Sequence, residues 1–153
     1  MSEFLAGKAV RKVAEGIVVE RPSALPPQGA RGDLFNIVGG RVVLKAIIGE
    51  VTTNIGAVAN NTKLEYNPAD AARGDMCNLL NITGAAAGTI LSITGTPANN
   101  LVAATNVALR QATQQVLKPG VIELNCAGAS VTGAIKWTVL YVPIDDGAYV
   151  EVA

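Results

Sequence analysis

The chain contains few side chains that could carry out catalysis. It has 153 residues and no histidine, so nucleophile systems that rely on a histidine base are excluded. A Ser–Lys pair is compatible with the composition, but no feature marks Ser92 or Ser130 as activated. The acidic residues are scattered, and Asp145 and Asp146 fall in a predicted exposed turn rather than a cleft. We therefore expect no catalytic residue, and a small hydrolase is the weakest of three hypotheses for the function.

Metal and cofactor sites have no better support in the sequence. The two thiols, Cys77 and Cys126, have a spacing that matches no metal-binding motif. The segment 84–88 is rich in glycine and alanine, but it lacks the lysine and the following helix pattern of a phosphate-binding loop. We expect neither a metal nor a cofactor. The cysteines could form one disulfide, but two buried thiols in a reducing cytosol are the preferred interpretation.

The tripeptide Arg-Gly-Asp occurs twice, at residues 31–33 and 73–75. One interpretation is an adhesion motif, and the simpler one is that Gly-Asp before a strand is ordinary turn chemistry. A guanidinium group can bind a carboxylate through two parallel hydrogen bonds. Arg31 and Arg73 are therefore candidates for contacts with a partner protein.

The composition favours a protein that packs against other proteins. The net charge is zero, which gives no electrostatic case for nucleic acid or an anionic membrane as partner. No stretch reaches the ~18 consecutive apolar residues of a membrane-spanning helix. Charged residues make up 16% of the chain and hydrophobic residues 50%, whereas about a quarter of residues are usually charged. Either much of the surface faces other subunits, or abundant alanine and glycine raise the hydrophobic average.

From Leu34 onward the sequence consists of strand and turn material. The clearest strand is predicted over 134–142, where one face is apolar and would place Trp137 and Tyr141 in the core. The ambiguous segment 101–111 could be helix or strand. The other predicted strands are 34–38, 41–51, 62–66, 76–82, 89–94, 115–117, 121–126 and 149–152. About eight to ten short strands, separated by turns, predict an all-β antiparallel sandwich or barrel.

Residues 1–33 differ from the body at 34–153 because they carry more charge and three prolines. A helix is predicted over 4–15, a short strand over 17–19 and an extended loop from Pro22 to Gly29. This segment is interpreted as an extended N-terminal arm that lies on a partner, with a mobile tail as the alternative. Deleting residues 1–30 is expected to leave a folded body. The arm residues predicted to bind the partner are Phe4, Val10, Val13, Ile17 and Val18.

Three segments in this order carry a resemblance to a known class of protein. They are LFNIVGGRVVLKAIIGEVTT at 34–53, PGVIEL at 119–124 and GAIKWTVLYVP at 133–143. With this pattern the chain resembles, over residues 34–152 in outline, the capsid decoration (cement) proteins of tailed bacteriophages. The resemblance implies a jelly-roll-like body, synthesis in the host cytoplasm, and a homotrimer bound to the major capsid protein on the capsid exterior. It supplies no functional motif, so the partner-binding residues are inferred from the sequence pattern alone.

The alternative hypothesis is a phage tail, baseplate or fibre module with a β-sandwich fold that binds host glycan. In that case Trp137 or Tyr149 would provide an aromatic platform for the sugar. Binding to a glycan array that depends on either residue would favour this module over a cement protein.

Overall fold

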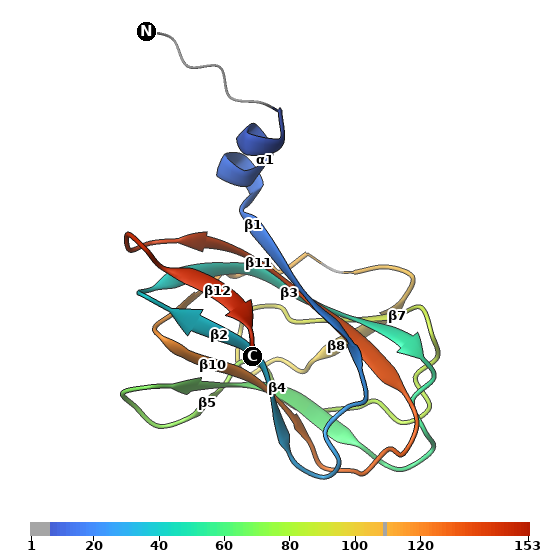
Figure 1. Ribbon diagram of the computed structural model, residues 1–153. Helices are drawn as coiled ribbons and strands as arrows, with labels where there is room; N and C mark the ends of the chain where they lie inside the picture. The colour runs from blue at the N-terminus through green and yellow to red at the C-terminus, as the bar shows by residue number, and fades with distance from the viewer. Residues whose placement is uncertain (1–6, 109) are drawn as a thin grey trace, which may run out of the picture.

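Two antiparallel β-sheets face each other across an aliphatic core in the computed structural model, which describes residues 7–108 and 110–153 (Figure 1). The fold is all-β, as the sequence predicts, and the two sheets form a sandwich. Its elements are α1 (Gly7–Glu15), β1 (Ile17–Ala24), β2 (Arg31–Val38), β3 (Val42–Thr53), β4 (Asn61–Pro68), β5 (Gly74–Asp75), β6 (Leu80–Asn81), β7 (Thr89–Ser92), β8 (Val102–Thr105), β9 (Gln115–Leu117), β10 (Gly120–Cys126), β11 (Ala134–Pro143) and β12 (Tyr149–Val152).

The chain changes sheets at most of its connections. Sheet A has the strand order β1-β11-β3-β7-β8, and β9 pairs with the first residues of β3. Sheet B has the order β12-β2-β10-β4-β5, and β6 also pairs with β4. Consecutive strands β1, β2, β3 and β4 therefore lie alternately in A and B, as do β10, β11 and β12. These crossings place the two ends of the body side by side, because β1 pairs with β11 and β2 with β12.

Alternation along the strands builds the core. In β11 the residues Ile135, Trp137, Val139 and Tyr141 have exposed fractions of 0–3%, whereas the residues between them are half-buried. This result confirms the predicted inward face and the core positions of Trp137 and Tyr141. Strand β10 buries Ile122, Leu124 and Cys126 in the same way.

The large indole of Trp137 is accommodated by a glycine on the neighbouring strand. The register of β11 and β3 places Gly49 directly opposite Trp137. A Cβ atom added to Gly49 would lie 2.8 Å from two carbon atoms of the indole ring. Glycine at this position therefore allows the only tryptophan of the chain to lie flat within the sandwich.

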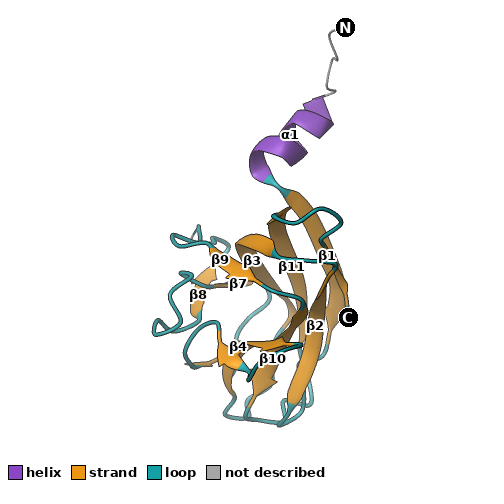
Figure 2. Cartoon of the chain, turned by 90° about the vertical axis from the view of Figure 1, so that its left-hand side faces the viewer, coloured by secondary structure: helices purple, strands orange, loops and turns teal. Residues whose placement is uncertain are grey.

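The body begins earlier than the sequence suggests. Strand β1 pairs with β11 from Ile17 to Ala24, so residues expected to form an arm belong to sheet A. The first three residues of the predicted loop from Pro22 to Gly29 are the end of this strand, and the rest is loop, as predicted. Of the helix predicted over 4–15, the part at 7–15 is observed as α1, which points away from the sandwich (Figure 2), and the rest lies outside the described residues. Only α1 and the residues before it precede the sheets, and Phe4 lies outside the described residues.

Gly16 joins α1 to the body. Its backbone N–H donates to the carbonyl of Lys12, which closes the last turn of the helix. Its φ of 108° favours glycine, and a Cβ atom would lie 2.7 Å from the carbonyl oxygen of Tyr141. The direction of α1 relative to sheet A is therefore set at a position that only glycine fits well.

Two other predicted segments differ from the structure. Of the strand expected over 76–82, only β6 at Leu80–Asn81 forms, and Met76 and Cys77 are buried in the segment between β5 and β6. The N–H of Leu64 on β4 donates to the Sγ of Cys77, and this contact takes the place of regular pairing. In the ambiguous segment 101–111, the described residues contain the short strand β8.

Candidate functional site

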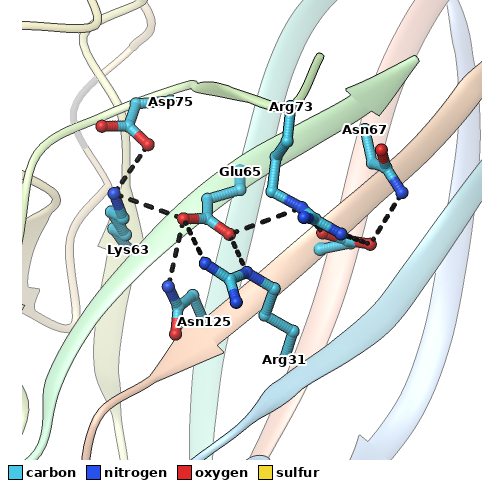
Figure 3. A network of polar contacts seen from close by, with 8 residues as sticks. Arg31, Lys63, Glu65, Asn67, Arg73, Asp75 and Asn125 are labelled. Atoms are coloured by element: carbon cyan, nitrogen blue, oxygen red, sulfur yellow. Dashed lines mark hydrogen bonds and ion pairs between the residues drawn. The ribbon is translucent and has the colours of Figure 1, made fainter. Parts of the chain in front are cut away.

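The outer face of sheet B carries a group of paired charges, here called the sheet B ion cluster (Figure 3). It includes residues from β2, β4 and β10 and from the turn that leads to β5. Inward alternate positions such as Leu64 and Leu124 fill the core, so the residues between them project outward. The cluster consists of Arg31, Lys63, Glu65, Arg73, Asp75 and Glu123, together with the amides of Asn67 and Asn125.

Two carboxylates lie at the centre of the cluster. The register of β4 and β10 places Glu65 directly opposite Glu123, and their side chains are only 4% and 6% exposed. Like charges in this position repel each other, and burial adds a desolvation cost to each carboxylate. The arrangement is therefore stable only with cations close to both.

Two arginines supply that positive charge. Arg31 donates from Nε to Glu65 Oε2 at 2.5 Å and from Nη2 to Oε1 at 3.4 Å. Arg73 donates from Nε to Glu123 Oε2 at 2.6 Å and from Nη2 to Oε1 at 3.1 Å. The Nε atom of Arg73 also lies 3.8 Å from Glu65 Oε2, so this one guanidinium group links the two carboxylates.

The cluster holds its charges fixed at neutral pH. Burial by itself would raise the pKa of Glu65, but hydrogen bonds from Arg31, Asn125 and Lys63 outweigh it and lower the pKa to about 2. The hydrogen bonds to Glu65 and Glu123 raise the pKa values of Arg31 and Arg73. A carboxylate with so low a pKa is a poor general base, because catalysis favours a pKa near the working pH. The geometry instead suits a rigid, charge-balanced surface.

The sequence analysis identifies Arg31 and Arg73 as candidates for contacts with a partner protein, but in the structure both are paired within the chain. The structure directs both guanidinium groups to carboxylates of the same chain, while their side chains remain 47% and 36% exposed. A role in partner binding stays a prediction. The sequence analysis missed Glu65 and Glu123, because their importance depends on the register between β4 and β10. The one sequence signal was their outward place in two alternating strands.

The described arm residues lie on α1 and on β1, where the helix meets sheet A. Val10 on α1 is 47% exposed and Val18 on β1 is 56% exposed, whereas Ile17 is half-buried against the core. Val13 is also part of α1. A groove of about 530 Å³ lies between the helix and the sheet and is lined by Arg11, Lys12, Glu15, Gly16, Ile17, Val18 and Leu140. We call it the α1 groove.

The remaining candidate residues have clear positions. Trp137 is 1% exposed, so it cannot form a surface platform for a sugar, whereas Tyr149 is 44% exposed. The first Arg-Gly-Asp tripeptide opens β2, and in the second Gly74 and Asp75 form β5. Both tripeptides therefore carry their glycine and aspartate in strands.

Cys77 and Cys126 are both free and buried, which agrees with the expected pair of buried thiols, while the reducing compartment stays a prediction. Burial raises the pKa of the Cys77 thiol to about 11 and also raises that of Cys126. Neither thiol is therefore suited to act as a nucleophile at neutral pH.

Some classes of site find no match in the described part of the chain. Across residues 7–108 and 110–153, His, Cys, Asp and Glu side chains form no group of three that could hold a metal ion. Over the same residues, no helix has both the length and the apolar character to cross a bilayer. No protein-family model, curated protein or solved structure matches this chain.

Proposed function

We propose that this protein is a virion structural protein that binds the outer surface of a phage capsid and stabilises the shell. In this proposal it binds the major capsid protein as a homotrimer and occupies the capsid exterior. The observation that carries the proposal is α1, a short amphipathic helix that stands away from its own body (Figure 2) next to a groove lined by both apolar and charged residues.

The helix is too short to be stable without a surface to pack on. Isolated helices of fewer than about 12–15 residues are marginal in water, and α1 has nine. Val10 is exposed, and the adjoining α1 groove presents the equally exposed Val18 beside Leu140, its register partner on β11. A neighbouring protein that covers helix and groove together would bury this apolar surface and stabilise the helix.

The strand order supports a second part of the proposal, that the body is a jelly roll. Jelly rolls consist of eight strands in two sheets and are common in viral capsids. Here β1-β11-β3-β7 form one four-stranded series and β2-β10-β4-β5 the other. The remaining strands are additions at the edges, or they pair alongside β3 and β4.

The surface chemistry is compatible with a binding protein that touches several subunits at once. The sheet B ion cluster has three cations and three carboxylates, so it presents little net charge to a partner. A homotrimer that engages several capsid subunits gains avidity through effective concentration, so each single contact can be weak.

The direct test is cryo-electron microscopy of virus particles that carry this chain. We expect density for the sandwich on the outside of the shell, at threefold or quasi-threefold positions, with α1 against a capsid subunit. Density at the tail tip alone would contradict capsid placement. It would favour the alternative, a tail, baseplate or fibre module that binds host glycan. Sedimentation equilibrium should also give three times the chain mass of 15.7 kDa, whereas a stable monomer would contradict the trimer.

A substitution in the α1 groove tests the contact surface. Val18→Asp places a charge on the exposed apolar side of β1 and should weaken capsid binding at least about tenfold. Val131→Asp is the matched control, because Val131 is 78% exposed in the loop between β10 and β11. Cosedimentation of each variant with undecorated capsids measures the effect. Equal binding by both variants would exclude the α1 groove from the contact.

A further inference from the structure

A cavity of about 430 Å³ opens between the two sheets, at the side where β1 faces the start of β2. Its floor is apolar and fully buried, and it includes Leu124, Ile135 and Trp137. Arg21, Gln28, Arg31 and Asp33 supply polar side chains to the lining, and Arg31 is already paired with Glu65. The combination of an apolar wall with a few convergent polar groups, in a volume of about 300–1,000 Å³, is typical of a small-molecule site.

The topology explains why the sandwich is open at this point. Strand β12 pairs with β2 over Phe35–Val38, so the residues of β2 from Arg31 to Asp33 extend past the end of β12. On the opposite sheet, the pairing of β1 with β11 has a register shift between Arg21 and Ala24. The cavity lies between these two sheet edges, and residues of the loop at 25–30 border it.

Arg21 occupies an unusual position for a charged residue. It follows Ile17 and Val19 in the row of β1 that packs against the core, and it lies opposite the buried Trp137 in the register. Its Nε atom is buried and has no hydrogen-bond acceptor among the described residues. A buried donor without a partner is costly, and such groups are rare in native proteins unless a ligand or water completes them.

We propose that this cavity binds a small carboxylate that also carries hydroxyl groups, such as an acidic sugar, with its carboxylate on Arg21. The flat edge of a guanidinium group matches the two oxygens of a carboxylate. The guanidinium group of Arg21 makes no ion pair with the described residues, so its terminal N–H groups are free to bind the carboxylate while Nε stays enclosed. This site does not depend on the proposed function, because its lining includes no residue of the α1 groove.

Other polar groups of the cavity can accept hydrogen bonds from the hydroxyl groups of such a ligand. The amide nitrogen of Gln28 donates to the carbonyl of Pro26 at 2.8 Å and to that of Ser130 at 2.7 Å. This leaves the amide oxygen as an acceptor held in a fixed position. The carboxylate of Asp33 is a second acceptor in the lining. Ligand hydroxyl groups can donate to both, which would select a hydroxylated carboxylate over a simple one.

Trp137 provides a built-in reporter, because it is the only tryptophan and it lines the cavity. Titration of the full chain with glucuronate should give a saturable change in tryptophan fluorescence. Glucose, the neutral counterpart, should give none, and acetate should bind more weakly than glucuronate. Absence of a saturable change with glucuronate up to about 10 mM, or tighter binding of inorganic phosphate, would overturn the proposal.

Variants at Arg21 separate a binding role from a structural one. Arg21→Gln should weaken glucuronate binding at least about tenfold, whereas Arg41→Gln, at a surface arginine paired with Asp145, should leave it unchanged. Because the Nε atom of Arg21 has no acceptor in the described chain, Arg21→Met should unfold at the same temperature as the unsubstituted protein or higher. A melting temperature several degrees lower for Arg21→Met would show that the arginine supports the fold, and it would overturn the proposal without any ligand.

Discussion

Glu65 and Glu123 are held side by side on sheet B at a cost that the surrounding cations must offset. Their opposition in the β4–β10 register and their burial both disfavour two negative charges. Arg31 and Arg73 offset this cost with paired hydrogen bonds. The two arginines therefore have a structural task, and any contact that they make with a partner must use N–H groups that remain free on their exposed sides.

The first prediction concerns acid stability. The pKa of Glu65 is about 2 in the folded chain, below the value of about 4.3 expected when unfolded. Its stabilisation is therefore fully present above about pH 5 and is lost as the pH falls toward 2, by about 3 kcal/mol at most. Asp145, whose pKa the hydrogen bonds from Arg41 lower to about 2, acts in the same direction. Urea unfolding at pH 7, 5 and 3 should show most of this loss between pH 5 and 3.

Glu65→Gln tests whether ionised Glu65 is responsible for the loss of stability at acid pH. The variant should be less stable at pH 7 by about 2–4 kcal/mol, because Arg31 and Lys63 lose their shared counter-charge. Its stability should also depend less on pH. Asp70→Asn is the control, since Asp70 pairs with Lys118 at a highly exposed position. Parallel pH curves for Glu65→Gln and the unsubstituted protein would contradict the assignment.

The buried thiols give a second prediction at the residue scale. Cys77 and Cys126 are both buried, and the pKa of Cys77 is raised to about 11, so few thiolates form at neutral pH. A chromogenic disulfide reagent should therefore leave the native protein unlabelled during the time in which the urea-unfolded protein reacts at both cysteines. Rapid labelling of native protein at either position would contradict the buried environment.

The sequence predicts some residue positions, such as those in the core, but it does not predict which charged side chains pair. Alternation along β11 was enough to place Trp137 and Tyr141 in the core, because burial repeats every second residue. The pairing of Arg31 with Glu65 was not visible, since the two residues belong to strands that β10 separates. The inward position of Arg21 was not predicted for a similar reason. Its inward position depends on β1 joining sheet A, and the sequence analysis assigned that segment to an arm.

At the element scale, β1 shows why a proline misled the sequence analysis. The sequence predicts that Pro22 starts a loop, but Pro22 lies within an edge strand that pairs with β11 on one side. An edge strand tolerates proline where the missing N–H would face away from the ladder. The strand therefore continues to Ala24, and the loop that the prolines do form is limited to the residues before β2.

The packing of β3 against β11 gives an element-scale prediction. Gly49→Ala would place a methyl group 2.8 Å from the indole of Trp137, so the ring or one of the strands must shift. Overpacking of this kind typically costs about 1–3 kcal/mol. Gly74→Ala on β5 is the control, because a Cβ atom there meets nothing within 4 Å. Chemical denaturation measures both, and equal stabilities would show that Trp137 has room to move.

At the scale of the whole molecule, the chain crosses repeatedly between the sheets, and for this reason a single sequence does not predict the order of the strands. The strands that contact each other most are distant in the chain, such as β1 with β11 and β2 with β10. Local patterns predict the strands and their inward faces, but the order within each sheet follows from long-range pairing. The predicted boundary at residue 33 fails to match the sheets for this reason, since the partner of β1 lies more than 100 residues away.

The position of that boundary can be tested with two truncations. Deletion of residues 1–15 removes α1 and leaves both sheets complete, so the melting temperature should change by no more than about 2–4 °C. The sequence-based expectation that deletion of residues 1–30 leaves a folded body needs correction, because this deletion also removes β1. It takes Ile17 and Val19 from the core and exposes the edge of β11. This second variant should melt at least about 10 °C lower or fail to fold, because several kcal/mol of apolar burial are lost. Circular dichroism melts compare the two variants, and similar melting temperatures would mean that β1 lies on the body without supporting it.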